Sequence, residues 1–139
     1  MYKYILFDLD GTLTDSAPGI IRCVQYALEK SGKGSYPDPD LLPFIGPPLT
    51  ESFQNFCGMS EGEAHAALEY YRERFARVGM FENSVYDGIP QLLQTLSQAG
   101  KILAVATSKP QLYAEKILEH YKLAPYFTTV AGPGFNGEL

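Results

Sequence analysis

Two aspartates stand two positions apart near the start of the sequence. Asp8 and Asp10 lie at the end of residues 2–9, a short apolar run rich in β-forming side chains, and Gly11 follows them. Like charges this close are costly unless a cation shares them or one is protonated. Oxygen ligands favour a hard ion such as Mg²⁺. One carboxylate could therefore act as a nucleophile and form an aspartyl phosphate, while the other moves a proton to and from the leaving oxygen.

Gly11 allows a sharp turn in which its amide could approach an anion. For an isolated motif of this kind, the alternative is an Asp-rich turn that merely ends a strand.

A second polar group stands far along the chain. Thr107, Ser108 and Lys109 follow the apolar residues 102–106 and precede a helix whose first turn can include Pro110. Hydroxyls and free amides at the start of a helix can bind an anion, and Lys109 adds a positive charge nearby. An ordinary helix cap is the alternative for this group alone. Two such strand ends in one small sheet indicate phosphate chemistry.

Alternating elements must position these residues. Apolar spacing predicts a helix over 16–31 and a longer one that begins at a capping box of Ser60 and Glu63 and runs to about residue 79. From residue 86 the pattern predicts a helix, a strand at 102–106, another helix and a strand at 127–131. Alternation of this kind is typical of βαβ units on a parallel sheet.

The number of residues between the two polar groups predicts an insertion. A crossover between neighbouring parallel strands needs roughly 30 residues, and far more separate Asp8 from Thr107. We therefore expect an α/β, Rossmann-like core formed by residues 1–14 and 84–139. Residues 15–83 would be an inserted α-helical domain.

Composition limits the partners and the compartment. The 139 residues contain 11 Lys and Arg against 16 Asp and Glu, for a net charge of −5. This charge argues against nucleic acid as a partner. The first apolar run is too short for a signal peptide or a membrane span, and Cys23 and Cys57 make no disulfide framework. We expect a cytoplasmic protein without a membrane partner.

These motifs together resemble the haloacid dehalogenase superfamily of phosphotransferases, in particular its phosphoglycolate-phosphatase-like members with a helical cap. The resemblance rests on Asp8–Ser16, the helical insert directly after it, Val85–Ile89 and Ala104–Pro110. It implies a Mg²⁺-dependent phosphomonoester hydrolase of a small phosphorylated metabolite, with phosphoglycolate or a nucleoside monophosphate as substrate. A phosphomutase such as β-phosphoglucomutase is an alternative within the same superfamily.

The resemblance also implies roles for single residues. Asp8 would be the nucleophile and a Mg²⁺ ligand, and Asp10 the general acid and base and a Mg²⁺ ligand through its carbonyl. The cap would close over the substrate and exclude water. The candidate phosphate-binding residues are Gly11, Thr107, Ser108 and Lys109. The candidate substrate-facing residues of the insert are Asp15, Phe44 and Gly46.

The sequence departs from the family pattern at its end. The resemblance implies a lysine after the third core strand and acidic residues after a fourth, and neither a lysine nor an acidic pair follows residue 131. We therefore also weigh a truncated, catalytically incomplete chain with a structural or binding role. Without a fourth strand, Tyr4–Phe7 would form an exposed apolar edge, which predicts a homodimer or strand exchange.

Overall fold

The chain divides into two compact units in the computed structural model, which describes residues 1–134. One unit joins residues 1–15 to the segment from residue 84 onward, and the other comprises residues 16–83. These bounds differ from the expected ones only at Asp15, which belongs to the first unit. The end of the expected core range, 135–139, lies outside the described residues.

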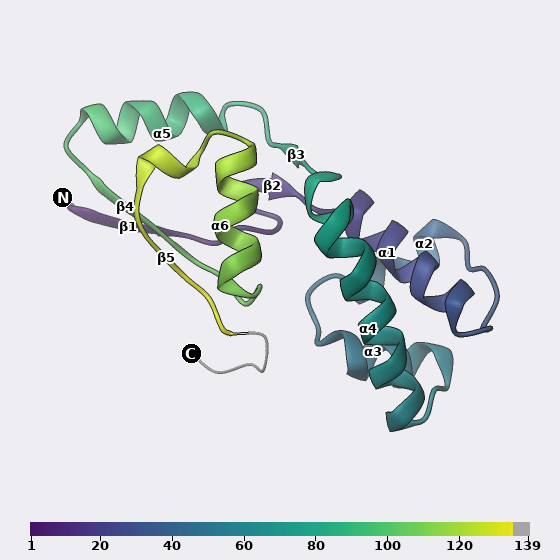
Figure 1. The fold of residues 1–139 in the computed structure, drawn as a ribbon. Coiled ribbons are helices and arrows are strands. Elements are labelled where there is room, and N and C mark those ends of the chain that lie inside the picture. Colours follow the sequence, from purple (N-terminus) through teal and green to yellow (C-terminus); the bar gives the residue numbers. More distant parts are fainter. Residues whose placement is uncertain (135–139) are drawn as a thin grey trace. The chain divides into compact units, whose positions relative to one another are not determined.

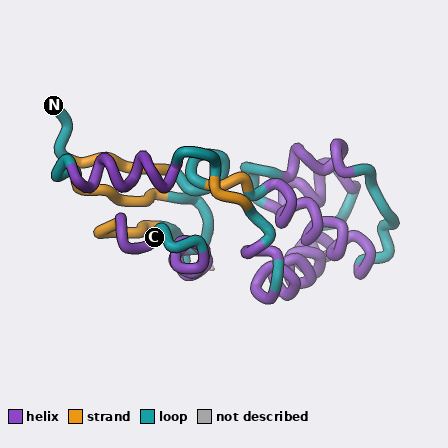
Figure 2. The backbone as a smooth tube through the Cα atoms, turned by 90° about the horizontal axis from the view of Figure 1, so that it is seen from above, coloured by secondary structure: helices purple, strands orange, loops and turns teal. Residues whose placement is uncertain are grey.

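The first unit is built on a three-stranded parallel sheet. Its strands are β1 (Tyr4–Phe7), β4 (Ile102–Ala106) and β5 (Phe127–Ala131), in the order β1-β4-β5 (Figures 1 and 2). The register pairs Phe7 with Val105 and Ala106 with Ala131, so all three strands end at the same edge. The unit also contains helices α5 (Ile89–Gln98) and α6 (Gln111–His120) and the 3-10 turn η3 (Ala124–Tyr126). Its buried side chains include Leu93, Leu103, Val105, Ile117 and Leu118.

The sequence pattern predicted β4 and β5 with their observed bounds, whereas β1 is shorter than the expected 2–9. The strand ends early because the Leu9 carbonyl accepts hydrogen bonds from the amides of Thr12, Leu13 and Thr14, which turns the chain. An antiparallel pair that the pattern did not predict follows, formed by β2 (Thr14–Asp15) and β3 (Ser84–Val85). This pair joins the segments at which the chain leaves the first unit and returns to it.

The second unit is helical, as expected. It contains α1 (Ala17–Lys30), α2 (Asp38–Leu41), η1 (Leu42–Phe44), α3 (Leu49–Cys57), α4 (Glu61–Arg77) and η2 (Gly79–Phe81) (Figure 1). Helix α1 packs along α4, and α3 packs on α4 as well. The expected capping box is present, because Ser60 Oγ accepts the Glu63 amide and the Glu63 carboxylate accepts the Ser60 amide. The core of this unit includes Val24, Leu28, Phe53, Ala67 and Phe75.

A charge cluster ties the last residues of this unit to its two long helices. Glu82 accepts from Arg22 of α1 at 2.7 Å and from Arg74 of α4. The hydrogen bond from Arg74 is the main cause that lowers the pKa of the Glu82 carboxyl, and the same bond raises the pKa of Arg74. The cluster therefore stabilises the unit only while Glu82 is ionised.

Of the helices in residues 1–134, none has both the length and the apolar character needed to span a bilayer.

Candidate active site

The first candidate residues lie in the turn directly after β1. Leu9 is fully buried and anchors this turn, so the aspartates on either side of it lie nearer the surface. Asp8 is exposed, and its Oδ1 accepts the Leu9 amide at 2.7 Å. Asp10 is only partly exposed. The sheet edge thus presents one open and one half-buried carboxylate.

Gly11 makes the turn possible. Its φ of +78° lies in the left-handed region that favours glycine. Its amide donates to the Thr14 carbonyl at 2.8 Å. This differs from the expectation that the Gly11 amide faces an anion, because the amide is engaged within the turn.

The second candidate group lies beyond the carboxyl end of β4, beside the first in the sheet order. The Thr107 amide donates to the Ala131 carbonyl at 3.0 Å, which ties this loop to the end of β5. The Lys109 amide donates to Thr107 Oγ1 at 3.1 Å, so the hydroxyl closes a tight turn. Ser108 is exposed at the top of this turn.

An ion pair brings the two groups together. Lys109 Nζ lies 3.2 Å from Asp10 Oδ2, and the two side chains are 8% and 27% exposed. The other oxygen, Asp10 Oδ1, is buried and has no hydrogen-bond partner within residues 1–134. A buried carboxylate oxygen of this kind is stabilised by a proton or a cation. The site therefore combines a charge-paired carboxylate oxygen with a buried one whose hydrogen-bonding capacity is unused within the described residues.

The donor set fits a magnesium ion. Asp8 offers exposed carboxylate oxygens and Asp10 offers its main-chain carbonyl oxygen, and hard oxygen donors of this kind are the ligands that Mg²⁺ prefers. No cluster of three or more His, Cys, Asp or Glu side chains able to hold a metal occurs within residues 1–134. The described residues thus supply part of a coordination shell.

Comparison with known proteins decides the family. A model of the haloacid dehalogenase-like hydrolase family matches residues 5–133. The chain belongs to this family. The match includes both polar groups and both units, and it confirms the resemblance inferred from the motifs.

The chain is similar to proteins whose names give different activities. A 5'-nucleotidase of Pseudomonas aeruginosa is 46% identical over 98% of this chain, and a phosphoglycolate phosphatase of Vibrio parahaemolyticus is 30% identical over 94%. The chain spans 62% and 60% of their lengths. The solved structure of protein tyrosine kinase A from Mycobacterium tuberculosis has a TM-score of 0.85 and 40% identity, covering 99% of this chain and 62% of that one.

The three candidate substrate-facing residues lie in different surroundings. Asp15 is in β2 and pairs with Ser84. Gly46 is exposed on a turn. Phe44 is 2% exposed, with its ring centroid 5.2 Å from that of Phe53 and 5.7 Å from that of Phe56. The expectation for Phe44 is corrected, because its ring belongs to the core of the helical unit of this family member.

Sequence reasoning missed two residues near the site. Thr14 is fully buried, and its Oγ1 has no hydrogen-bond partner within the described part of the chain. Gly132 packs against the backbone of the Lys109 loop. The pairing of β4 with β5 could have indicated Gly132, because residues that follow neighbouring parallel strands lie close together.

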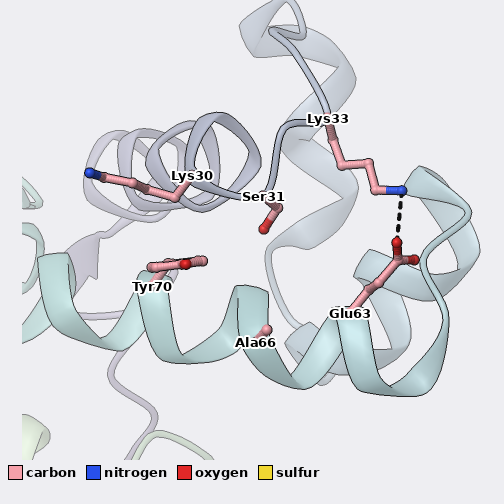
Figure 3. A pocket seen from close by; sticks show the side chains of 6 residues that line it. All are labelled: Lys30, Ser31, Lys33, Glu63, Ala66 and Tyr70. Carbon is pink, nitrogen blue, oxygen red and sulfur yellow. Dashed lines mark hydrogen bonds and ion pairs between the residues drawn. The ribbon is translucent and has the colours of Figure 1, made fainter.

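The helical unit also contains a hollow of about 180 Å³ between the end of α1 and α4, here called the α1–α4 hollow (Figure 3). Figure 3 shows an ion pair on its rim, between Lys33 Nζ and Glu63 Oε1 at 3.3 Å. The Ser60 amide and then Lys33 lower the pKa of Glu63. The hollow is lined by Lys30, Ser31, Lys33, Glu63, Ala66 and Tyr70. It contains no carboxylate pair, so we place the chemistry at the sheet edge.

Proposed function

We propose that this protein is a Mg²⁺-dependent phosphomonoester hydrolase that works through an aspartyl phosphate on Asp8. The observation that carries the proposal is the Lys109–Asp10 ion pair, because it joins the two polar groups at one sheet edge. Open α/β sheets bind their ligands at the carboxyl ends of the strands. Membership in the hydrolase family supports the same reaction class.

In the first step, a carboxylate oxygen of Asp8 attacks the phosphorus atom of the substrate in line with the ester oxygen. The bond between phosphorus and the ester oxygen breaks, and Asp10 gives that oxygen a proton. In the second step, a water attacks the phosphorus of the aspartyl phosphate while Asp10 takes its proton. The bond between phosphorus and the Asp8 oxygen breaks, inorganic phosphate leaves, and Asp8 is regenerated as a free carboxylate.

The loop after β4 would hold the phosphoryl oxygens during both steps. Thr107 and the exposed Ser108 offer hydroxyls, and Lys109 offers a positive charge. Asp8 and Asp10 would hold the magnesium ion, which when bound supplies positive charge against the phosphate and the two carboxylates.

We propose a small phosphorylated metabolite as the substrate, with a nucleoside monophosphate first and phosphoglycolate second. The relatives named above support these two classes. The aspartyl-phosphate step is common to hydrolases and mutases, and the acceptor of the phosphoryl group distinguishes them. Water as acceptor makes a phosphatase, and a sugar hydroxyl makes a phosphomutase.

The test is the release of inorganic phosphate from an aryl phosphate, a nucleoside monophosphate and phosphoglycolate, with and without Mg²⁺. We expect turnover that requires the metal and is abolished in Asp8→Asn, which keeps the side-chain shape but removes the nucleophile. Asp87→Asn is the matched control, because Asp87 is an exposed aspartate of the same unit outside the site.

Turnover of the same size in Asp8→Asn would overturn the proposal. Folded protein that releases no phosphate from any of these esters would instead favour the structural or binding role. Transfer to a sugar phosphate without phosphate release would favour the phosphomutase.

A further inference from the structure

Gly132, the first residue after β5, lies against the backbone of the loop that carries Lys109. A Cβ atom at position 132 would stand 2.5 Å from the Lys109 carbonyl oxygen and 3.2 Å from the Gln111 amide nitrogen. Both neighbours are backbone atoms, which cannot move aside as a flexible side chain would. Position 132 therefore requires a residue without a side chain.

The close approach is held by hydrogen bonds on either side of Gly132. The Ala131 carbonyl accepts the Thr107 amide at 3.0 Å, and the Pro133 carbonyl accepts the Gln111 amide at 2.9 Å. The segment of residues 131–133 thus spans the loop from Thr107 to Gln111, and we call it the β5 clamp.

The side chain of Lys109 depends on this backbone. It is 8% exposed, and a lysine this buried is normally paired. Its Nζ reaches Asp10 Oδ2 at 3.2 Å, whereas Asp10 Oδ1 keeps no partner within residues 1–134. The position of Lys109 therefore decides which Asp10 oxygen is held in an ion pair and which keeps its capacity to carry a proton.

We propose that Gly132 is a positioning residue, which acts through the β5 clamp to keep Lys109 on Asp10 and so to hold the Asp10 carboxylate in the orientation in which it transfers the proton. The role of this contact in turnover rests on the proposed function, whereas the clamp itself does not. A side chain at position 132 pushes the Lys109 loop away from β5, and Lys109 leaves Asp10.

The first experiment tests the clamp without any activity. Amine acetylation followed by mass spectrometry measures the reactivity of each lysine, and the exposed Lys116 and Lys122 of the same unit are internal standards. Lys109 reacts slowly in the parent protein and several-fold faster in Gly132→Ala. Gly62→Ala is the matched control, because a Cβ at Gly62 meets nothing within 4 Å.

A second variant covers the case in which Gly132→Ala does not fold. Gln111→Pro removes the amide that donates to Pro133, and proline is tolerated at the first position of a helix such as α6. Like Gly132→Ala, Gln111→Pro raises the reactivity of Lys109.

The second experiment tests the effect on the reaction by a double-mutant cycle with Lys109→Met, using aryl phosphate turnover. Gly132→Ala alone lowers kcat by about 10²-fold, the size of loss that a small misplacement of reacting groups produces. In the Lys109→Met background, Gly132→Ala lowers kcat by less than about 2-fold, because the effects of substituting two residues that act through one contact are not additive.

Faster labelling of Lys109 together with a non-additive cycle supports the proposal. Unchanged labelling of Lys109 in folded Gly132→Ala or Gln111→Pro overturns the clamp. If Gly132→Ala lowers kcat equally in the parent protein and in Lys109→Met, the positioning role of Gly132 is overturned. If the parent protein releases no phosphate, the proposed function fails. The labelling of Lys109 then still tests whether the β5 clamp holds this side chain.

Discussion

The two carboxylate oxygens of Asp10 have different surroundings. Oδ2 is paired with Lys109, and Oδ1 is buried without a hydrogen-bond partner in residues 1–134. Asp8, two positions earlier, is exposed and accepts the amide of Leu9. The open carboxylate suits a nucleophile that must reach a substrate, and the paired one suits a group that moves a proton while it stays in place.

Asp10→Asn tests this division of roles. The amide keeps the size of the side chain but cannot donate and accept the proton, so we expect kcat for phosphate release to fall by about 10²- to 10⁴-fold. An ester with a more acidic leaving group should lose less, because it needs less protonation. A loss that is the same for strongly and weakly acidic leaving groups would contradict the general-acid role of Asp10.

At the scale of elements, the sequence predicted those parts whose signal is local. The strand at 102–106 and the capping box of α4 are confirmed, because an apolar run and a Ser-to-Glu spacing are complete within a few residues. The pair β2–β3 was not predicted, since two-residue strands have no periodicity and their pairing joins distant segments. Phe44 was wrongly expected to face the substrate, because the rings of Phe53 and Phe56 that cover it come from a later helix.

The candidate site likewise has features with a local sequence signal and features that depend on distant segments. The residue types of Asp8, Asp10 and Thr107 were visible as motifs. The Lys109–Asp10 contact and the close approach of Gly132 follow from the register of β1, β4 and β5, which no single segment encodes. Sequence motifs therefore indicated the candidate residues, and the sheet determined which of them meet.

Ser60→Ala tests the contribution of the capping box at the start of α4. The substitution removes the acceptor of the Glu63 amide, at an expected cost of about 1 kcal/mol in the free energy of unfolding. Urea denaturation followed by far-ultraviolet circular dichroism measures this cost. Ser97→Ala, at an exposed position of α5, is the control and should change the value little. Equal effects of the two substitutions would contradict the cap.

At the scale of the whole molecule, each unit has its own core, and the charge cluster at Glu82 belongs to the helical unit. Because the pKa of Glu82 is lowered in the folded protein, its contribution is present above its ordinary value of 4.5 and is lost as the pH falls through the folded pKa. We expect Glu82→Gln to cost about 1–2 kcal/mol near neutral pH.

Unfolding free energies measured from about pH 7 to about pH 3 should show this cost shrink below the ordinary pKa of a glutamate. Glu29→Gln, at an exposed position of α1, is the control. A cost of Glu82→Gln that stays constant across the whole range would contradict the role of the ionised carboxylate.

The sheet leaves apolar side chains of β1 uncovered. Tyr4 and Leu6 lie on one face of this edge strand and are 65% and 70% exposed. Exposed apolar edge strands promote pairing between chains, so we propose that the 139-residue chain self-associates through β1. Leu6→Lys should weaken the association in light scattering, whereas Leu92→Lys, at an exposed leucine of α5, should not. A monodisperse parent monomer at high concentration would contradict this proposal.

The central claim is that Asp8 carries the phosphoryl group. Borohydride reduces an acyl phosphate and converts the aspartate that carries it to homoserine, which tandem mass spectrometry locates in the chain. With substrate and Mg²⁺ present, we predict homoserine at position 8 in the parent protein and none in Asp8→Asn. Homoserine at another position, or phosphate release that continues at the parental rate in Asp8→Asn, would contradict the account.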